Sequence, residues 1–218
     1  MDEIKEKHDL VKASQILSTV FSPIIIPTYC TMIAMWVTPL SILPESIRFI
    51  ATLVVFGLTA LLPTLIIVLL MRMGKVSNLD ISNRRQRLLP LMLVLVCYVF
   101  CAWYMHHSHA FWWLVMYYVS GCVTNIVVAI ISLKWKISAH GAGMGNMAGM
   151  LAALMAGGYS LVNMLPWLCT AIILAGVVGS ARVILHRHTV AQVVAGILVS
   201  MVITAMLMTM PVFANMYN

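Results

Sequence analysis

The sequence predicts an all-α fold, a polytopic transmembrane helix bundle of about seven helices, with six as the alternative count. Of the 218 residues, 62% are apolar and 9% are charged, and the mean hydropathy is +1.01. A soluble domain needs a polar shell over its core, and so few charged residues cannot form one. Period-two alternation does not persist along the chain, which argues against a transmembrane β-barrel. We therefore expect the lipid bilayer as the surroundings of this protein, and no nucleic-acid partner.

Long uncharged stretches mark the predicted spans, because roughly 20 apolar residues are needed to cross a bilayer. The stretches are 14–38, 49–71, 88–105, 110–133, 141–160, 165–185 and 189–210. Residues 1–13 carry charges of both signs and predict a short amphipathic segment at the membrane surface. A single transmembrane domain over 14–213 is expected to follow it.

The distribution of basic residues predicts the orientation. Seven crossings would place the N-terminus and the segments 72–87, 134–140 and 182–188 on one side of the membrane. Every Lys and Arg except Arg48 then lies on that side. The positive-inside rule makes this side cytoplasmic. We expect an integral protein of a bacterial inner membrane, with the N-terminus and the site described next on the cytoplasmic face.

Three stretches far apart in the sequence bring Arg and His side chains to this predicted side. They are 75–87 (KVSNLDISNRRQR), 136–140 (KISAH) and 182–188 (RVILHRH). Outside the N-terminal segment, Asp80 is the only acidic residue there. Several bases with almost no counter-ion favour a multiply charged anion, and phosphate is the expected one. Taken alone, 75–87 is also typical of a juxtamembrane anchor.

Small and polar residues inside the predicted spans indicate helix contacts. Gly141, Gly145 and Gly149 follow one another at GxxxG spacing, which is typical of close helix packing. Free backbone N–H groups at the start of that span are the alternative, because they can meet an anion. Asn125 and Asn146 lie within spans and are expected to bridge helices, since polar side chains in hydrocarbon need partners.

These residues resemble the type 2 phosphatidic acid phosphatase superfamily, whose members share a site with vanadium haloperoxidases. Arg182 and His188 match the spacing of the family's third motif (Ser-Arg, five residues, His, three residues, Asp), and Gly196 closes the pattern that follows. Ser138 and His140 match the second motif, Pro-Ser-Gly-His, as Ile-Ser-Ala-His. The resemblance covers 75–196 and predicts a phosphatase-like core at 75–210.

The resemblance implies an integral membrane phosphatase that hydrolyses a lipid phosphate or diphosphate monoester without a metal or other cofactor. His188 would attack phosphorus and form a phosphohistidine, and His140 would protonate the leaving oxygen and then activate water. Gln192 would orient His188, in the position of the family's Asp. The phosphate would be bound by Arg182, Arg87, Arg84, Lys75 and Ser138.

Departures from the family motifs leave two alternatives. Ala181 stands in place of the motif's Ser, Asp80 in place of a Lys, and Gln192 in place of the Asp. An amide can accept a ring N–H but cannot stabilise an imidazolium by charge, which favours a catalytically impaired relative that binds a phosphorylated lipid. A haem-binding or transport membrane protein is the other alternative. A two-haem cytochrome pairs histidines across the middle of helices, whereas here every His lies at a span end or in the N-terminal tail.

Overall fold

The computed structural model describes residues 2–74 and 88–210, with side chains from residue 5 and, after the gap, from residue 90. Helices make up most of these two ranges, and no strand occurs in them. The predicted all-α bundle is confirmed. Five of its helical segments are long and apolar enough to cross a membrane: Glu45–Arg72, Pro90–His107, Trp112–Lys134, Leu165–Ile184 and Val190–Thr209.

The longest of these segments is composite. It joins α3 (Glu45–Phe56) through the π-helical turn Gly57–Leu61 to α4 (Leu62–Arg72). The other long helices are α5 (Leu88–His107), α6 (Trp112–Lys134), α8 (Leu165–Ile184) and α9 (Val190–Thr209). Two further helices lie among them: α2 (Ile26–Val37), followed by the 3-10 turn Pro39–Ile42, and α7 (Ala139–Ala156).

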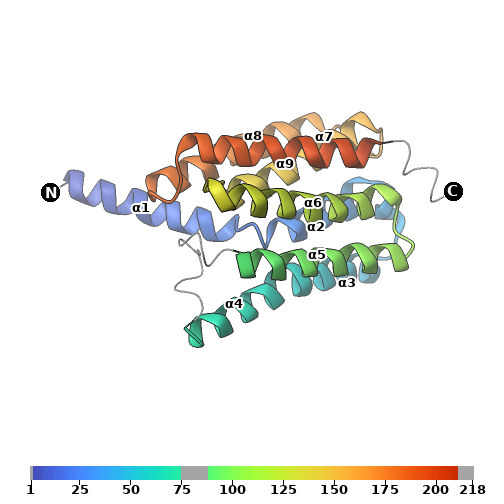
Figure 1. Cartoon of the computed structure of the whole chain (residues 1–218). Helices are drawn as coiled ribbons and strands as arrows, with labels where there is room; N and C mark the ends of the chain where they lie inside the picture. Colours follow the sequence, from blue (N-terminus) through green and yellow to red (C-terminus); the bar gives the residue numbers. More distant parts are fainter. Residues whose placement is uncertain (1, 75–87, 211–218) are drawn as a thin grey trace.

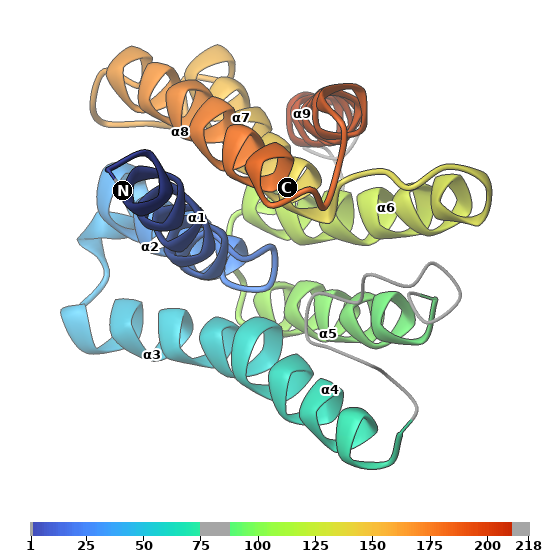
Figure 2. The ribbon, with the colours of Figure 1, turned by 90° about the vertical axis from the view of Figure 1, so that its left-hand side faces the viewer.

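The helices run back and forth along one common direction (Figure 1). The first helix, α1 (Asp2–Val20), enters the bundle from one end, and its outer half extends beyond the other helices. The turns after α6 and α8 lie at this same end, which we call the α1 end. Stretches 136–140 and 182–188 therefore meet at one end of the bundle, as the sequence predicted. Viewed from there, α7, α8 and α9 lie on one side, α3–α4 and α5 on the other, and α1–α2 and α6 between them (Figure 2).

The predicted span 14–38 is wrong as a single helix. Helix α1 ends at Val20 and α2 begins at Ile26, so the chain breaks between them. Pro23 and Pro27 explain the break, because proline lacks an N–H and disfavours helical backbone in the preceding residue. Helix α1 runs without a break past residue 13, the predicted end of the N-terminal segment, and Ser14 and Ser18 on its second half are buried.

Helix α7 is almost entirely buried and packs backbone to backbone against α9. A Cβ added at Gly141 would lie 2.6 Å from the carbonyl oxygen of Val193, and one at Gly149 would lie 2.6 Å from that of Met201. At Gly145 an added Cβ would collide with the carbonyl oxygen of Ile197. The packing role predicted for the three GxxxG glycines is confirmed, because only glycine allows the two backbones to approach this closely.

Asn146 joins three helices inside the bundle. Its Oδ1 accepts hydrogen bonds from Thr124 Oγ1 on α6 (3.2 Å) and Thr204 Oγ1 on α9 (2.9 Å). Ser120 donates in turn to Thr204 Oγ1 at 3.1 Å. The bridging role predicted for Asn146 is confirmed. Together with the glycine contacts, this network fixes α7, the helix that carries His140, against its neighbours.

Candidate active site

The turn between α8 and α9 brings Arg182 and His188 together. The backbone N–H groups of Arg187 and His188 both donate to the carbonyl oxygen of Arg182, at 3.0 and 3.4 Å. His186 adopts the left-handed conformation, with φ 52°, and this reverses the chain directly after the last turn of α8. Histidine is among the non-glycine residue types enriched in this region. Arg182 and His188 are both buried, at 2% and 7% exposure.

His188 is held through its Nδ1 atom. This atom lies 3.1 Å from Gln192 Oε1 and 3.3 Å from the carbonyl oxygen of Lys136. Both oxygens are acceptors only, so in the neutral ring Nδ1 carries the proton and Nε2 keeps the lone pair. The backbone N–H of Thr189 donates to the same Gln192 oxygen, and Thr189 Oγ1 caps the first turn of α9. Gln192 thus combines a helix cap with the contact to His188 that the family's Asp would make.

Ser138 caps the start of α7. Its Oγ accepts a hydrogen bond from the backbone N–H of Gly141 at 3.2 Å, and its own N–H donates to the carbonyl oxygen of Gln192 at 3.1 Å. The side chain is fully buried. It is not among the residues that line the three cavities described below. The contacts of Ser138 are those of an N-cap residue, which also ties α7 to α9.

Ser18, on α1, was not predicted to belong to the site. Its Oγ accepts a hydrogen bond from Arg182 Nη1, and it lies 3.2 Å from His140 Nε2. His140 Nε2 also lies 3.0 Å from the carbonyl oxygen of Ser18. That oxygen can only accept, so Nε2 of His140 carries a proton here.

The break at Pro23 explains why α1 ends in the site. Ser18 lies in the last turn of α1, where carbonyl oxygens have no partner within the helix. The C-terminal end of a helix also favours cationic groups, and Arg182 lies against it. The two prolines, Pro23 and Pro27, were the available sequence signal. They end the first helix early and leave its last carbonyls in need of donors.

An inner cavity of about 340 Å³ lies next to these side chains. Arg182, His140 and His188 all line it, together with four hydroxyl-bearing residues: Thr19, Ser22, Thr64 and Ser132. Much of the rest of the lining is apolar and comes from the α1–α2 connection and helices α4, α5 and α6: Pro23, Ile24, Ile25, Ile67, Pro90, Leu91, Val94 and Val128. A smaller cavity of about 90 Å³ shares much of this lining and extends toward Tyr98, Asn125 and Asn146.

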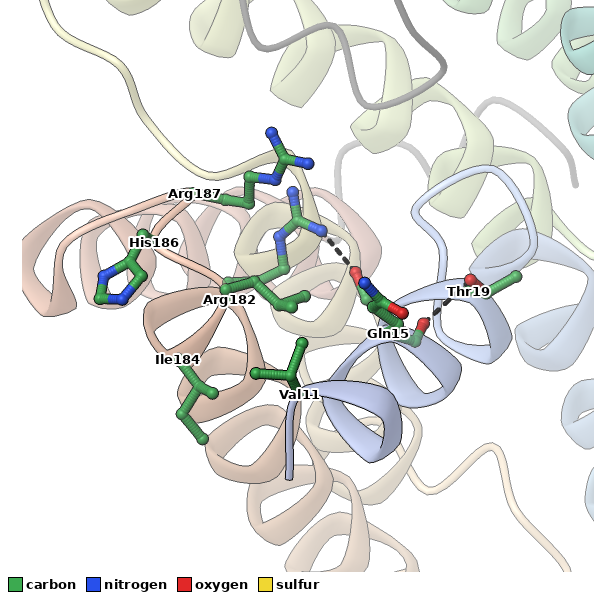
Figure 3. A pocket seen from close by; sticks show the side chains of 9 residues that line it. Val11, Gln15, Thr19, Arg182, Ile184, His186 and Arg187 are labelled. Carbon is green, nitrogen blue, oxygen red and sulfur yellow. Dashed lines mark hydrogen bonds between the residues drawn. The ribbon is translucent and has the colours of Figure 1, made fainter. Parts of the chain in front are cut away.

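A second pocket, the end pocket, lies on the other side of Arg182. It has a volume of about 390 Å³ and lies between α1 and the end of α8 (Figure 3). Gln15, Ser18 and Thr19 line it from α1, and Arg182 and Arg187 from the opposite side. Because Arg182 and Thr19 line both cavities, they lie in the wall between the two.

Three predicted phosphate-binding residues, Arg87, Arg84 and Lys75, lie outside the described residues. The cluster His106, His107 and His109 lies at the opposite end of the bundle, where His107 stacks on Trp103 with ring centroids 5.3 Å apart. Within 2–74 and 88–210, no group of three or more His, Cys, Asp or Glu side chains is placed to hold a metal ion.

Comparison of the chain with family models, with curated proteins and with solved structures found no match. The fold and the site define an integral membrane helix bundle with a buried Arg–His–His cluster at one end. The resemblance to the type 2 phosphatidic acid phosphatases rests on the motifs of the sequence.

Proposed function

We propose that this protein is an integral membrane phosphatase that hydrolyses a lipid phosphate or diphosphate monoester through a phosphohistidine intermediate. One observation carries the proposal. Arg182, His140 and His188, the residues that match the second and third family motifs, line a single cavity although they come from different parts of the chain. A guanidinium group and two imidazoles are sufficient to bind a phosphoryl group, attack it and move the protons.

The reaction has two steps. In the first, His188 Nε2 attacks phosphorus, the P–O bond to the lipid breaks, and His140, which starts as the imidazolium, gives its Nε2 proton to the leaving oxygen and becomes neutral. In the second, His140 takes a proton from water, the water oxygen attacks phosphorus, and the P–N bond breaks to release phosphate. Arg182 stabilises the charge on the phosphoryl oxygens in both steps. The proton on Nδ1 of His188, held by Gln192, supports this assignment because it leaves Nε2 as the nucleophile.

The apolar part of the inner cavity supports a lipid as the substrate. Apolar side chains such as Ile67, Leu91 and Val94 line the same cavity as the two imidazoles, and Arg182 is the only Arg, Lys, Asp or Glu among its described lining residues. A phosphate bound at Arg182 would leave a hydrocarbon chain in apolar surroundings, where its burial is favourable. A small soluble phosphate ester has no hydrocarbon chain to bury against this apolar lining.

The distribution of charge supports a cytoplasmic site in a bacterial inner membrane. Arg72, Lys134 and the α8–α9 turn with Arg187 lie at the α1 end of the bundle, as does α1 with its lysines. Arg48 lies near the start of α3, at the other end. By the positive-inside rule, the α1 end faces the cytoplasm. Accessibility of a cysteine introduced at Arg72 to a membrane-impermeant thiol reagent, compared between intact and opened cells, tests this orientation.

A catalytically impaired protein that binds a lipid phosphate is the second candidate, and Gln192 favours it. The amide oxygen of Gln192 positions the ring of His188, but it carries no negative charge to stabilise the imidazolium that forms when His188 acts. In this case Arg182 and the imidazoles would hold the phosphate and the reaction would stop at binding.

Phosphate release by the purified protein decides between these functions. The substrates are phosphatidic acid, a prenyl monophosphate and a prenyl diphosphate, each in mixed micelles. We expect release, together with an acid-labile phosphoenzyme trapped by rapid quenching, and we expect His188→Ala to lack both. His106→Ala, an imidazole removed at the far end of the bundle, is the matched control. Release that persists in His188→Ala would refute the nucleophile assignment, and lipid binding without release would favour the second candidate.

A further inference from the structure

The end pocket is chemically different from the inner cavity. It is lined by the guanidinium groups of Arg182 and Arg187, the amide of Gln15 and the hydroxyls of Ser18 and Thr19. None of the described residues that line it is acidic. Hydrogen-bond donors and positive charge without a carboxylate among them select an anion rather than a cation or an apolar group.

The turn after α8 fixes Arg187 beside Arg182. The N–H of Arg187 donates to the carbonyl oxygen of Arg182. The left-handed backbone of His186 reverses the chain toward the end of α8 and so allows this hydrogen bond. Figure 3 shows the side chain of Arg187 extending alongside that of Arg182, with the ring of His186 directed away from them. Two planar guanidinium groups next to each other match the several oxygens of a phosphate-type anion.

Helix α1 supplies the opposite wall of the pocket. Gln15, Ser18 and Thr19 stand at positions i, i+3 and i+4 on its last two turns, and Thr19 Oγ1 donates to the carbonyl oxygen of Gln15 at 2.9 Å. Among the residues that the structure describes, Arg182 is the one cationic side chain that lines both the end pocket and the inner cavity. An anion in the end pocket therefore lies next to a phosphoryl group bound at His188, with Arg182 between the two.

We propose that the end pocket is a second binding site for a phosphate-type anion, and that Arg187 and Arg182 hold this anion. The inference rests on the proposed function for what the anion is. It is either free phosphate, the product leaving the site, or the outer phosphate of a diphosphate lipid whose inner phosphorus is attacked by His188, in which case the bond to the lipid oxygen breaks and diphosphate is the product. Both have the same chemistry, and they differ in whether the second phosphate is attached to the lipid.

Arg187→Gln tests the site, and Arg72→Gln, which removes an exposed charge at the same end of the bundle, is its matched control. The first measurement is the affinity of purified protein for inorganic phosphate, by phosphorus NMR titration in detergent. The second is the ratio of kcat/KM for farnesyl diphosphate to that for farnesyl monophosphate. A lost charged hydrogen bond changes either quantity by about tenfold or more. Unchanged melting temperatures establish that the variants are folded, and Gln15→Leu repeats the test with no change of charge.

Weaker phosphate binding in Arg187→Gln but not in Arg72→Gln identifies free phosphate as the ligand. A fall in the diphosphate preference alone identifies the attached phosphate. The proposal is overturned if Arg187→Gln changes neither quantity, or if Arg72→Gln has an equal effect. Should the wild-type protein hydrolyse neither lipid, the proposed function fails, and the phosphate titration still decides whether the end pocket binds an anion.

Discussion

Arg182 and Ser18 are joined by a hydrogen bond from Nη1 to Oγ, although 164 positions of sequence separate them. This contact joins the N-terminal helix to Arg182, which comes from the second half of the chain, as do His140 and His188. It holds the guanidinium group at the boundary between the inner cavity and the end pocket. The position of Arg182 thus depends on a residue that carries none of the family motifs.

We expect Ser18→Ala to lower kcat/KM for a lipid phosphate by about tenfold, because a buried hydrogen bond to a charged group is lost. Ser14→Ala is the matched control, since Ser14 is equally buried one turn earlier on the same helix. Ser18→Thr keeps the hydroxyl and should retain most of the activity. Equal kcat/KM values for Ser18→Ala and the wild type would show that Arg182 is positioned without Ser18.

Gln192→Glu should raise kcat by at least about tenfold, because a carboxylate at the same position adds charge that stabilises the imidazolium of His188. The side chains have the same length, so the contact to Nδ1 and the cap on α9 are preserved. Gln192→Leu removes the acceptor and should lower kcat. Steady-state kinetics with phosphatidic acid measure both variants. If Gln192→Glu loses activity while its melting temperature is unchanged, the absence of a negative charge beside His188 does not limit the activity of the wild-type protein.

Val94→Trp should distinguish a lipid from a soluble substrate. Val94 lines both the inner cavity and its deeper extension, so an indole there fills the space assigned to the hydrocarbon chain. We expect kcat/KM for a long-chain lipid phosphate to fall by at least about tenfold, since the free energy lost when a few CH₂ groups are no longer buried corresponds to a change of that size. Activity on a short-chain analogue should remain. Val96→Trp, at an exposed position on the same helix, is the control, and an equal loss on both substrates would argue against a chain in this cavity.

Gly145→Ala should destabilise the fold by about 1–3 kcal/mol, the usual cost of overpacking. The added Cβ meets Ser200 Oγ and the Ile197 carbonyl oxygen, and the carbonyl oxygen cannot move without shifting α9. Gly176→Ala is the control, because a Cβ there meets nothing within 4 Å. Thermal unfolding in detergent should show a melting temperature several degrees lower for Gly145→Ala alone. Equal melting temperatures for the two variants would contradict the close approach of α7 and α9.

The sequence was sufficient to predict the helix bundle and the meeting of 136–140 with 182–188, because apolar length and the placement of basic residues are local properties. It was also sufficient to predict close helix packing at Gly141, Gly145 and Gly149, since GxxxG spacing has a direct steric meaning, but not that α9 is the partner helix. It failed at residues 14–38, where apolar length outweighed the signal of Pro23 and Pro27. Ser18 was missed for the same reason. A serine within a predicted span gives no indication of a hydrogen-bond partner far away in the sequence. The contact of Ser18 with Arg182 is explained only by the end of α1 at Val20.

The end of α1 at Val20 also affects how the protein can be handled. The second half of α1 forms part of the wall around Arg182, so removal or replacement of this helix would change the site. A truncation that removes the second half of α1 would take away the Ser18 contacts. Inactivity of such a shortened protein would then reflect the missing wall rather than the chemistry of the native chain.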